Sequence, residues 1–418
     1  MLRRSPCFRS GKPMYPHLRW RVTRRPRQVF RREVHVDRKQ RAQDEFSKHE
    51  PRLRELSQWM YDNPEVGYKE FRTSQRYVDM LAENGFDVEY PAYGLDTAFS
   101  ARIGSSGPEV IICAEMDALP EVGHACGHNI IGAASLGAGL ALAPLVEELG
   151  FQLTVLGTPA EEAFGGKVDL IEAGAFKGAA AAMMVHPATK DIVDPEFLAV
   201  VHIDIEFFGH ESHASGSPDL GVNALDAAVQ AYVNVSTLRQ QLKDSDRVHG
   251  IITHGGAAPN IIPGHTAMSW YVRAASDVRL DEIYPKVMRC FEAAALATGC
   301  RLEVKEMGCR YKDLRSNPLL VDLYQANSER AGREMNRLAD LPPETSGSTD
   351  MGNVSHEVPS IHPMLDLHCY PIVNHQKEFA AQTLSEDGKR TICDGALAMA
   401  WTIIDLAEGD RWGELKTS

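Results

Sequence analysis

The sequence predicts an α/β protein with a mainly parallel sheet, interrupted by a second, smaller domain. A continuous apolar run at 109–116 is typical of a strand in a sheet that is covered on both faces. Strand and helix patterns alternate as far as residue 198, which indicates parallel strands joined by helices. From residue 199 the strands instead alternate apolar and polar residues, which indicates a sheet with one covered face. A chain of 418 residues also exceeds one ordinary core, so we expect two domains.

The first domain begins with helices. Apolar residues at helical spacing predict a helix over 44–62, which the Asn63-Pro64 pair ends, and a second helix that ends near Gly85. Strands and helices then alternate, and this alternation predicts parallel pairing. The predicted order is strands at 86–90, 97–103 and 109–116, a helix at 130–148, a strand at 152–158, a helix at 167–173 and a strand at 179–186.

The pattern changes over 199–308. Its predicted order is a strand at 199–209, a helix at 222–242, strands at 247–254 and 266–274, a helix at 280–298 and a strand at 301–307. This is the β-α-β-β-α-β order of a ferredoxin-like unit. We therefore predict an inserted domain at 199–308, within a first domain formed by 44–198 and 309–418. The alternating strands leave one sheet face for water or for a partner chain.

Charge is spread unevenly along the chain. Residues 1–40 carry a balance of +11 against −13 for the whole protein. The acidic remainder argues against nucleic acid as the main partner. The basic leader is compatible with a targeting arm, a nucleic-acid tail or an unstructured extension, and it lacks the apolar core of a secretory signal. We favour a disordered extension at 1–43, from a start codon placed too far upstream.

Composition points to a reducing compartment and to no membrane. The eight cysteines are widely spaced and form no CxxC pair, a pattern typical of a cytoplasmic protein. No apolar stretch reaches the about 18 residues that a membrane span needs. The most apolar segment, 130–145, is rich in Gly and Ala and is interrupted by Pro144, so we expect a buried helix there.

A short motif, HACGHN at 124–129, holds the first candidate metal ligands. It follows a predicted strand and Asp117, and ligands of α/β proteins gather at the carboxyl ends of strands. A thiolate at Cys126 and an imidazole at His128 suit zinc, and more loosely cobalt or manganese. Gly127 allows the backbone to bend so that both face one point. Alone, the motif is equally compatible with a loop cysteine beside surface histidines.

Two further strand ends carry similar side chains. TPAEEAFGGK at 158–167 places Glu161 and Glu162 after one strand, and His186 ends the next. Paired acids are usually solvated, and a histidine at a strand end is often a core residue. Three consecutive strand ends with such residues instead favour metal-assisted hydrolysis, in which one carboxylate binds metal and the other accepts a proton from water.

As an ordered set, MDALP, HACGH, PAEE and HP resemble the aminoacylase/carboxypeptidase family of metal-dependent amidohydrolases, peptidase family M20. The resemblance covers about 44–405. Its closest branches are the aminobenzoyl-glutamate hydrolases and the dipeptidases that cleave Xaa–basic dipeptides. It implies a phosphorylase/hydrolase-like catalytic domain, a ferredoxin-like lid or dimerisation domain, and a homodimer. It also implies two divalent metal ions (Zn²⁺ first, Mn²⁺ or Co²⁺ as alternatives) and a small amide or dipeptide substrate with a free carboxylate, and neither nucleic acid nor membrane as partner.

The resemblance also implies residue roles. Glu161 would be the general base and Asp117 would orient a ligand. Cys126 would bridge the two ions, and His375, in VNHQKEFA, would be the last ligand. The full implied ligand set is Cys126, His128, Glu162, His186 and His375.

Several candidates lie in or near the predicted inserted domain. By the resemblance, His213 would stabilise the oxyanion, often in a neighbouring subunit, although a histidine in such a loop is otherwise a surface residue. Asn260 would contact substrate. Arg273 would clamp its carboxylate with paired hydrogen bonds, or else simply face outward on an alternating strand. A polar loop at 346–363 would line the cleft with Ser348, Thr349 and Asp350.

Two positions depart from the family pattern. Asn129 follows the CGH motif where Asp is common, and Glu115 stands where other branches carry a metal-binding histidine. The first leaves the ligand set intact, and the second favours the cysteine-bridged branch. Two rival functions stay open: a non-catalytic metal-binding or assembly protein, and an RNA- or membrane-binding protein acting through the arginine-rich leader.

Overall fold

The computed structural model describes residues 37–162, 164–341 and 347–416. Most of the predicted extension, residues 1–36, lies outside them. The first helix, α1 (Arg38–Asp62), begins before the predicted residue 44 because the Asp37 side chain accepts a hydrogen bond from the Lys39 N–H at 3.0 Å and so caps it. The predicted boundary after residue 43 therefore falls inside a helix.

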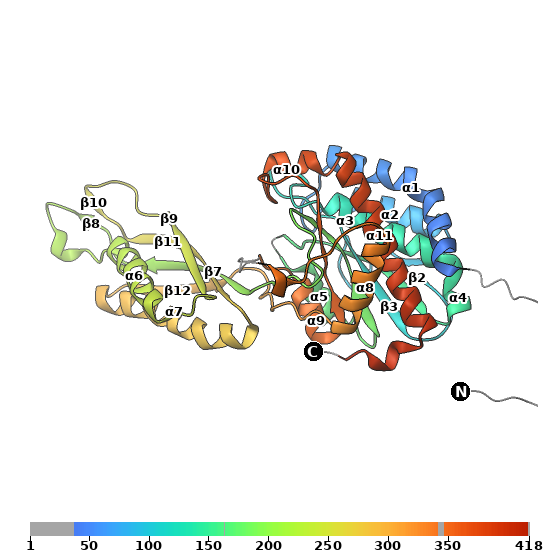
Figure 1. The fold of residues 1–418 in the computed structure, drawn as a ribbon. Coiled ribbons are helices and arrows are strands. Elements are labelled where there is room, and N and C mark those ends of the chain that lie inside the picture. Colours follow the sequence, from blue (N-terminus) through green and yellow to red (C-terminus); the bar gives the residue numbers. More distant parts are fainter. Residues whose placement is uncertain (1–36, 163, 342–346, 417–418) are drawn as a thin grey trace, which may run out of the picture. The chain divides into compact units, whose positions relative to one another are not determined.

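A six-stranded sheet forms the centre of the larger part of the fold (Figure 1). Its order is β1-β2-β4-β3-β5-β13, and β4, β3, β5 and β13 run parallel, as the continuous apolar strands predicted. β2 is antiparallel to β4, and β1 is antiparallel to β2. The strands are β1 (Asp87–Glu89), β2 (Phe99–Ile103), β3 (Glu109–Glu115), β4 (Gln152–Thr158), β5 (Ala181–Met183) and β13 (Ser360–Ile361).

Helices cover both faces of this sheet. One core contains α1, α2 (Phe71–Glu83), α3 (His128–Leu142), α8 (Pro318–Arg330) and α11 (Glu386–Glu408). A second core lies on the opposite face, where α5 (Gly166–Glu172) packs on β4, α9 (Met351–Glu357) packs on β13, and the two helices contact each other. The sheet is therefore buried on both sides, so only its edges and strand ends can carry an open site.

The apolar helix after the HACGHN motif is the most buried element. All 15 residues of α3 are buried, and the predicted helix at 130–148 is divided because Pro144 interrupts it with a 3-10 turn before α4 (Val146–Leu149). By length and composition, His128–Leu149 would be apolar enough to cross a membrane, with a mean hydropathy of 1.7. Because 89% of its most apolar 18-residue stretch is buried inside the protein, this segment packs as a core helix.

The strand predicted to end at His186 is split. β5 ends at Met183, and His186 opens a separate short strand, β6 (His186–Ala188), which pairs in parallel with β14 (Met364–Asp366). The backbone of His186 is thus fixed by the pairing of β6 with β14, beyond the end of the six-stranded sheet.

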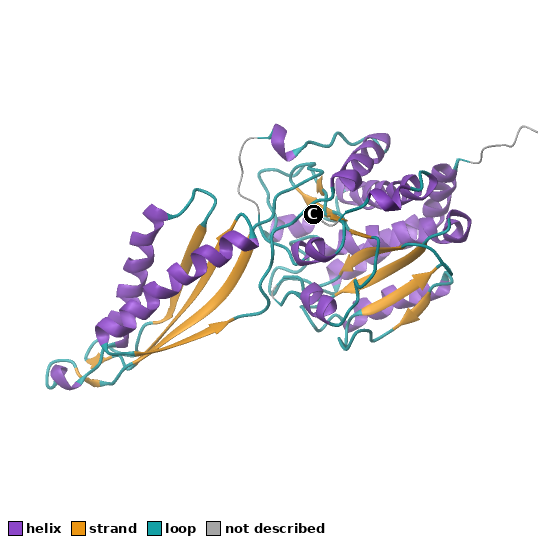
Figure 2. Cartoon of the chain, turned by 90° about the horizontal axis from the view of Figure 1, so that it is seen from below, coloured by secondary structure: helices purple, strands orange, loops and turns teal. Residues whose placement is uncertain are grey.

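A second sheet, antiparallel and four-stranded, is built from β7 (Ala199–Phe208), β9 (Arg247–His254), β11 (His265–Ala274) and β12 (Arg301–Glu306). Its order is β12-β7-β11-β9. Two helices, α6 (Ala224–Leu238) and α7 (Asp277–Thr298), cover one face (Figure 2). The elements follow the predicted β-α-β-β-α-β order, with an added pair of two-residue strands, β8 (Ser212–His213) and β10 (Ile261–Ile262).

Candidate metal centre

The HACGHN segment places Cys126 and His128 on either side of a left-handed glycine. Gly127 has φ 91° and is the N-cap of α3, so His128 is the first residue of that helix. A side chain at Gly127 would put a Cβ 2.3 Å from the Cγ atom of Pro187, the residue after His186. Because Gly127 has no side chain, its backbone can lie directly against Pro187 in β6.

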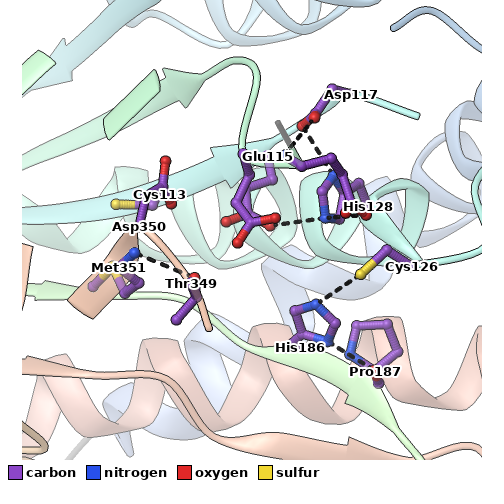
Figure 3. Close-up of polar contacts among 12 residues, drawn as sticks. Cys113, Glu115, Asp117, Cys126, His128, His186, Pro187, Thr349, Asp350 and Met351 are labelled. Atoms are coloured by element: carbon purple, nitrogen blue, oxygen red, sulfur yellow. Dashed lines mark hydrogen bonds and ion pairs between the residues drawn. The ribbon is translucent and has the colours of Figure 1, made fainter. Parts of the chain in front are cut away.

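One group of candidate ligands comprises Cys126, His128 and His186. The Cys126 Sγ lies 3.4 Å from the His186 Nε2 (Figure 3). Ligand atoms of the three residues all lie within 4.8 Å of one another. The Nδ1 atom of His186 bonds to the carbonyl oxygen of Pro187 at 2.8 Å, which fixes the ring and leaves Nε2 toward the sulfur.

A second group shares the same sulfur. Ligand atoms of Cys126, Glu162 and His375 also lie within 4.8 Å of one another, with the His375 Nε2 3.6 Å from the Glu162 Oε2. His375 reaches this place because its backbone N–H donates to the Ala125 carbonyl oxygen at 2.8 Å. The structure thus brings all five residues of the predicted ligand set together, with Cys126 common to both groups.

The buried polar atoms of these residues fit a cation. Within the described residues, the His128 Nε2 and the Glu162 Oε1 are buried without a hydrogen-bond partner and lie 3.8 Å apart, a costly state for such atoms. Burial and the neighbouring carboxylates raise the pKa of the Cys126 thiol well above its usual value. A cysteine sulfur, three imidazoles and a carboxylate form a donor set suited to zinc or a similar divalent ion.

Asp117 orients two of the candidate ligands. Its Oδ1 lies 3.0 Å from the His128 Nδ1, and its Oδ2 accepts from the Glu162 backbone N–H at 3.1 Å. Asn129, the departure from the family pattern, lies away from this cluster. Its amide donates to the Ser57 and Thr383 hydroxyls, each at 3.0 Å, and so ties α3 to its neighbours.

Glu161 lies in a pocket of acids. It is 8% exposed, and its carboxylate, with those of Glu115 and Asp350, forms a group whose oxygen atoms lie within 4.8 Å. Burial, followed by Glu115 and Asp350, raises the pKa of Glu161 well above its usual value. A carboxylate with so raised a proton affinity suits a general base.

A buried lysine, Lys167, was not among the predicted site residues. Its ammonium is fully buried and lies 2.5 Å from the Glu115 Oε1 and 2.6 Å from the Asp350 Oδ1. The other oxygen of Glu115 is 3.3 Å from the His128 Nε2 (Figure 3). The only sequence signal was the position of Lys167 just after the Gly-Gly turn that follows Glu162.

Comparison with known proteins decides the family. A model of peptidase family M20/M25/M40 matches residues 111–379. The chain belongs to this family. The Xaa-Arg dipeptidase of Mus musculus is 38% identical over 382 residues, covering 88% of each chain. One of the p-aminobenzoyl-glutamate hydrolase subunits of Escherichia coli (strain K12) is 29% identical and covers 68% of this chain and 64% of its own.

A solved structure gives the same fold. A dinuclear metal binding peptidase of the M20 family from Bacillus subtilis superimposes with a TM-score of 0.63 at 19% identity, over 86% of this chain and 99% of its own. With its family, fold and cluster of ligand atoms, this M20 chain is a metal-binding hydrolase of C–N bonds.

The predicted substrate residues of this M20 chain fall into two groups. In the first group, Arg273 Nη1 donates to the Ser348 hydroxyl at 2.7 Å. Thr349 is 2% exposed, and its hydroxyl accepts from the Met351 N–H. The predicted loop at 346–363 therefore contains helix α9, and Asp350 faces Lys167 rather than an open cleft.

His213 and Asn260 form the other group. They are neighbours, since β8 pairs with β10 and the Ala214 N–H donates to the Asn260 carbonyl oxygen at 3.0 Å. Both residues are exposed. Within the described residues, no hydrogen bond or ion pair joins either to the metal-ligand cluster, so their predicted roles stay predictions.

Proposed function

We propose that this M20 chain is a two-metal hydrolase that cleaves an amide or peptide bond whose amine side is an amino acid with a free carboxylate. The observation that carries the proposal is that the Cys126 sulfur belongs to two groups of candidate ligand atoms, one with His128 and His186 and one with Glu162 and His375. A single sulfur common to two groups is the arrangement expected of a bridging ligand.

The ligand groups divide between two ions. His128 and His186 would complete one with Cys126, and Glu162 and His375 the other. When bound, the two ions, zinc first with manganese or cobalt as alternatives, would polarise the scissile carbonyl and lower the pKa of water.

The chain's own residues supply the remaining chemistry. Glu161 accepts the proton of the attacking water and delivers it to the leaving nitrogen, a role that its buried, acid-lined position supports. Asp117 keeps His128 in one tautomer. Arg273, aligned by Ser348, binds the substrate carboxylate.

A second copy of the chain is the proposed partner. We assign 199–308 as its lid and dimerisation domain, and there His213 would serve the neighbouring centre. The edge strand β9 and helix α6 carry exposed apolar side chains that support this proposal. They are Ile251, Ile252, Val229, Tyr232 and Val233. We place the protein in the cytoplasm, because its seven described cysteines are all free thiols.

The test is a substrate panel on metal-loaded protein: β-alanyl-lysine, p-aminobenzoyl-glutamate and acylated amino acids, each with and without chelator. Turnover of at least one compound, abolished by chelation, is expected. Metal-loaded, folded protein that turns over none of them would favour the rival function of a non-catalytic metal-binding protein.

A pair of variants separates the two functions further. Glu161→Gln should lose turnover by about 10³-fold or more while it keeps the metal content of the parent. Glu147→Gln, an exposed glutamate on α4, is the matched control and should keep both. Parallel loss of metal and turnover in Glu161→Gln would contradict the role of general base.

A further inference from the structure

Glu115 is a buried carboxylate that lies outside the predicted ligand set. It is the last residue of β3, where parallel pairing places it opposite Thr158 of β4, and it is fully buried. Its Oε1 accepts a hydrogen bond from the Lys167 ammonium at 2.5 Å. Its Oε2 is buried without a hydrogen-bond partner among the described residues, a costly state unless a further cation or donor meets it.

This second oxygen of Glu115 faces the metal centre. It lies 3.3 Å from the His128 Nε2 (Figure 3), and the same nitrogen lies 3.8 Å from the Glu162 Oε1. Within the part of the chain that the structure describes, all three atoms are buried and none of them takes part in a hydrogen bond. Two carboxylate oxygens and one imidazole nitrogen therefore converge without any hydrogen bond among them.

The other nitrogen of His128 shows why this convergence requires a cation. The His128 Nδ1 lies 3.0 Å from the Asp117 Oδ1. With the ring proton on Nδ1, Nε2 presents a lone pair toward the Glu115 carboxylate, and two facing acceptors repel one another. Asp117 is only two residues beyond Glu115, so the end of β3 and the start of the next loop meet both nitrogens of one ring.

The spacing of the two facing atoms also fits a shared ion. Two donors bound at about 2.0–2.1 Å to one tetrahedral zinc ion lie about 3.3–3.4 Å apart. The 3.3 Å between the Glu115 Oε2 and the His128 Nε2 matches this separation. Carboxylates that bind metal are themselves held by hydrogen bonds, and the Lys167 ammonium holds Glu115 by its opposite oxygen.

We propose that Glu115 is a further metal ligand, which binds through Oε2 the ion held by His128. The Lys167 ammonium positions the carboxylate through Oε1, and Asp350 completes the pairing of that ammonium at 2.6 Å. The affinity of a cation site rises with the number of its charged ligands, so the role of Glu115 is measurable as metal affinity. This inference rests on the proposed function and enlarges its metal centre.

The first test is a titration of the metal-free protein with Zn²⁺ in competition with a chromophoric chelator. The parent should bind two ions. Glu115→Gln keeps the size of the side chain and an oxygen for Lys167, and it should bind one ion at least about 10-fold more weakly, a loss typical even of residues that only support a ligand. Parental affinity in a folded Glu115→Gln variant would overturn the proposal.

Asp350→Asn is the matched control. The two Asp350 oxygens accept from the Lys167 backbone N–H and ammonium, so this variant also removes one carboxylate from the same lysine. It should keep the parental affinity for both ions. An equal loss of affinity in the two variants would assign the effect to the charge around Lys167 and contradict a ligand role for Glu115.

A second measurement needs no variant. Anomalous diffraction from crystals of the parent soaked with Zn²⁺ locates the ions directly. An ion bound by His128 should lie about 2.0–2.2 Å from the Glu115 Oε2. An ion at His128 that lies beyond bonding distance of Glu115 would overturn the proposal, whatever the variants do.

Both measurements are independent of turnover, so the ligand and the hydrolase can fail separately. Weakened binding by Glu115→Gln alone, with no compound of the substrate panel hydrolysed by the metal-loaded parent, would support the ligand and contradict the hydrolase. Parental metal binding by Glu115→Gln, with hydrolysis of at least one compound by the parent, would contradict the ligand and support the hydrolase.

Discussion

The hydroxyl of Tyr311 donates a hydrogen bond of 2.5 Å to the backbone carbonyl oxygen of Glu161. Tyr311 is 5% exposed, and its own backbone exchanges hydrogen bonds with Val200 at 2.9 Å and 3.0 Å. It therefore joins the two segments that enter and leave the second sheet to the peptide between Glu161 and Glu162. One side chain positions both the proposed base and a proposed ligand.

Tyr311→Phe should lower kcat by about 10-fold, with KM less affected, because the Glu161 carbonyl loses its fixed donor and the loop gains freedom. The matched control is Tyr324→Phe, since the Tyr324 hydroxyl is buried and has no hydrogen-bond partner in the part of the chain that the structure describes. Steady-state kinetics and metal analysis check this. Equal kcat in both variants would show that the hydrogen bond positions nothing of importance to the reaction.

Gly127→Ala should disrupt the metal centre locally. The new Cβ would meet Pro187 beside His186, and φ 91° adds backbone strain. We expect metal affinity to fall by about 10-fold or more, as for disturbed supporting residues in metal sites. Gly174→Ala has a similar φ of 86° and no atom within 4 Å of its Cβ, so it should cost about 1 kcal/mol and leave metal binding intact. Metal titration and urea unfolding of both variants measure the difference.

Topology explains why the predicted strand-end ligands lie together in the structure. β4, β3 and β5 are adjacent and parallel, so the segments after them meet at one edge and bring Cys126, Glu162 and His186 together. His375 is far away in the sequence, and only the family resemblance pointed to it. Its approach depends on a backbone hydrogen bond to Ala125 and a left-handed φ of 70°, which no local pattern reveals.

Sequence reasoning missed groups that act through tertiary contacts. Lys167 is a single basic residue at the start of α5, and its sequence neighbours do not reveal that Glu115 and Asp350 would surround its ammonium. On the second sheet, Arg273 lies opposite Arg247 because of the register between β11 and β9. The alternation of polar and apolar residues in the sequence does not reveal that register.

Lys167→Met should destabilise the fold by about 3–5 kcal/mol, because it leaves Glu115 and Asp350 buried without their cation. Lys48→Met, which removes an exposed lysine paired with Glu45, should cost at most about 1 kcal/mol. Urea unfolding gives both values. Adding Glu115→Gln and Asp350→Asn to Lys167→Met should recover part of the loss, and a triple variant no more stable than Lys167→Met would argue against uncompensated charge as the cause.

The buried carboxyl group of Glu70 gives the free energy of unfolding a defined dependence on pH. Its Oε1 accepts from the Ala160 N–H at 2.9 Å, while its Oε2 is buried without a hydrogen-bond partner among the described residues. Burial, assisted by Asp117, raises the pKa of Glu70 from 4.5 to about 7. Between these two values the folded state binds more protons than the unfolded state, so stability falls as pH rises.

The Glu70→Gln variant lacks this proton and should lack this slope. In metal-free protein, the stability of the parent relative to Glu70→Gln should therefore decrease by about 2.5 kcal/mol between pH 5 and pH 8, since each pKa unit corresponds to about 1.4 kcal/mol. Urea unfolding of both proteins across this range measures the difference at each pH. Parallel pH profiles would mean that Glu70 is ionised at pH 5 in the folded protein, and that the Ala160 N–H compensates its burial.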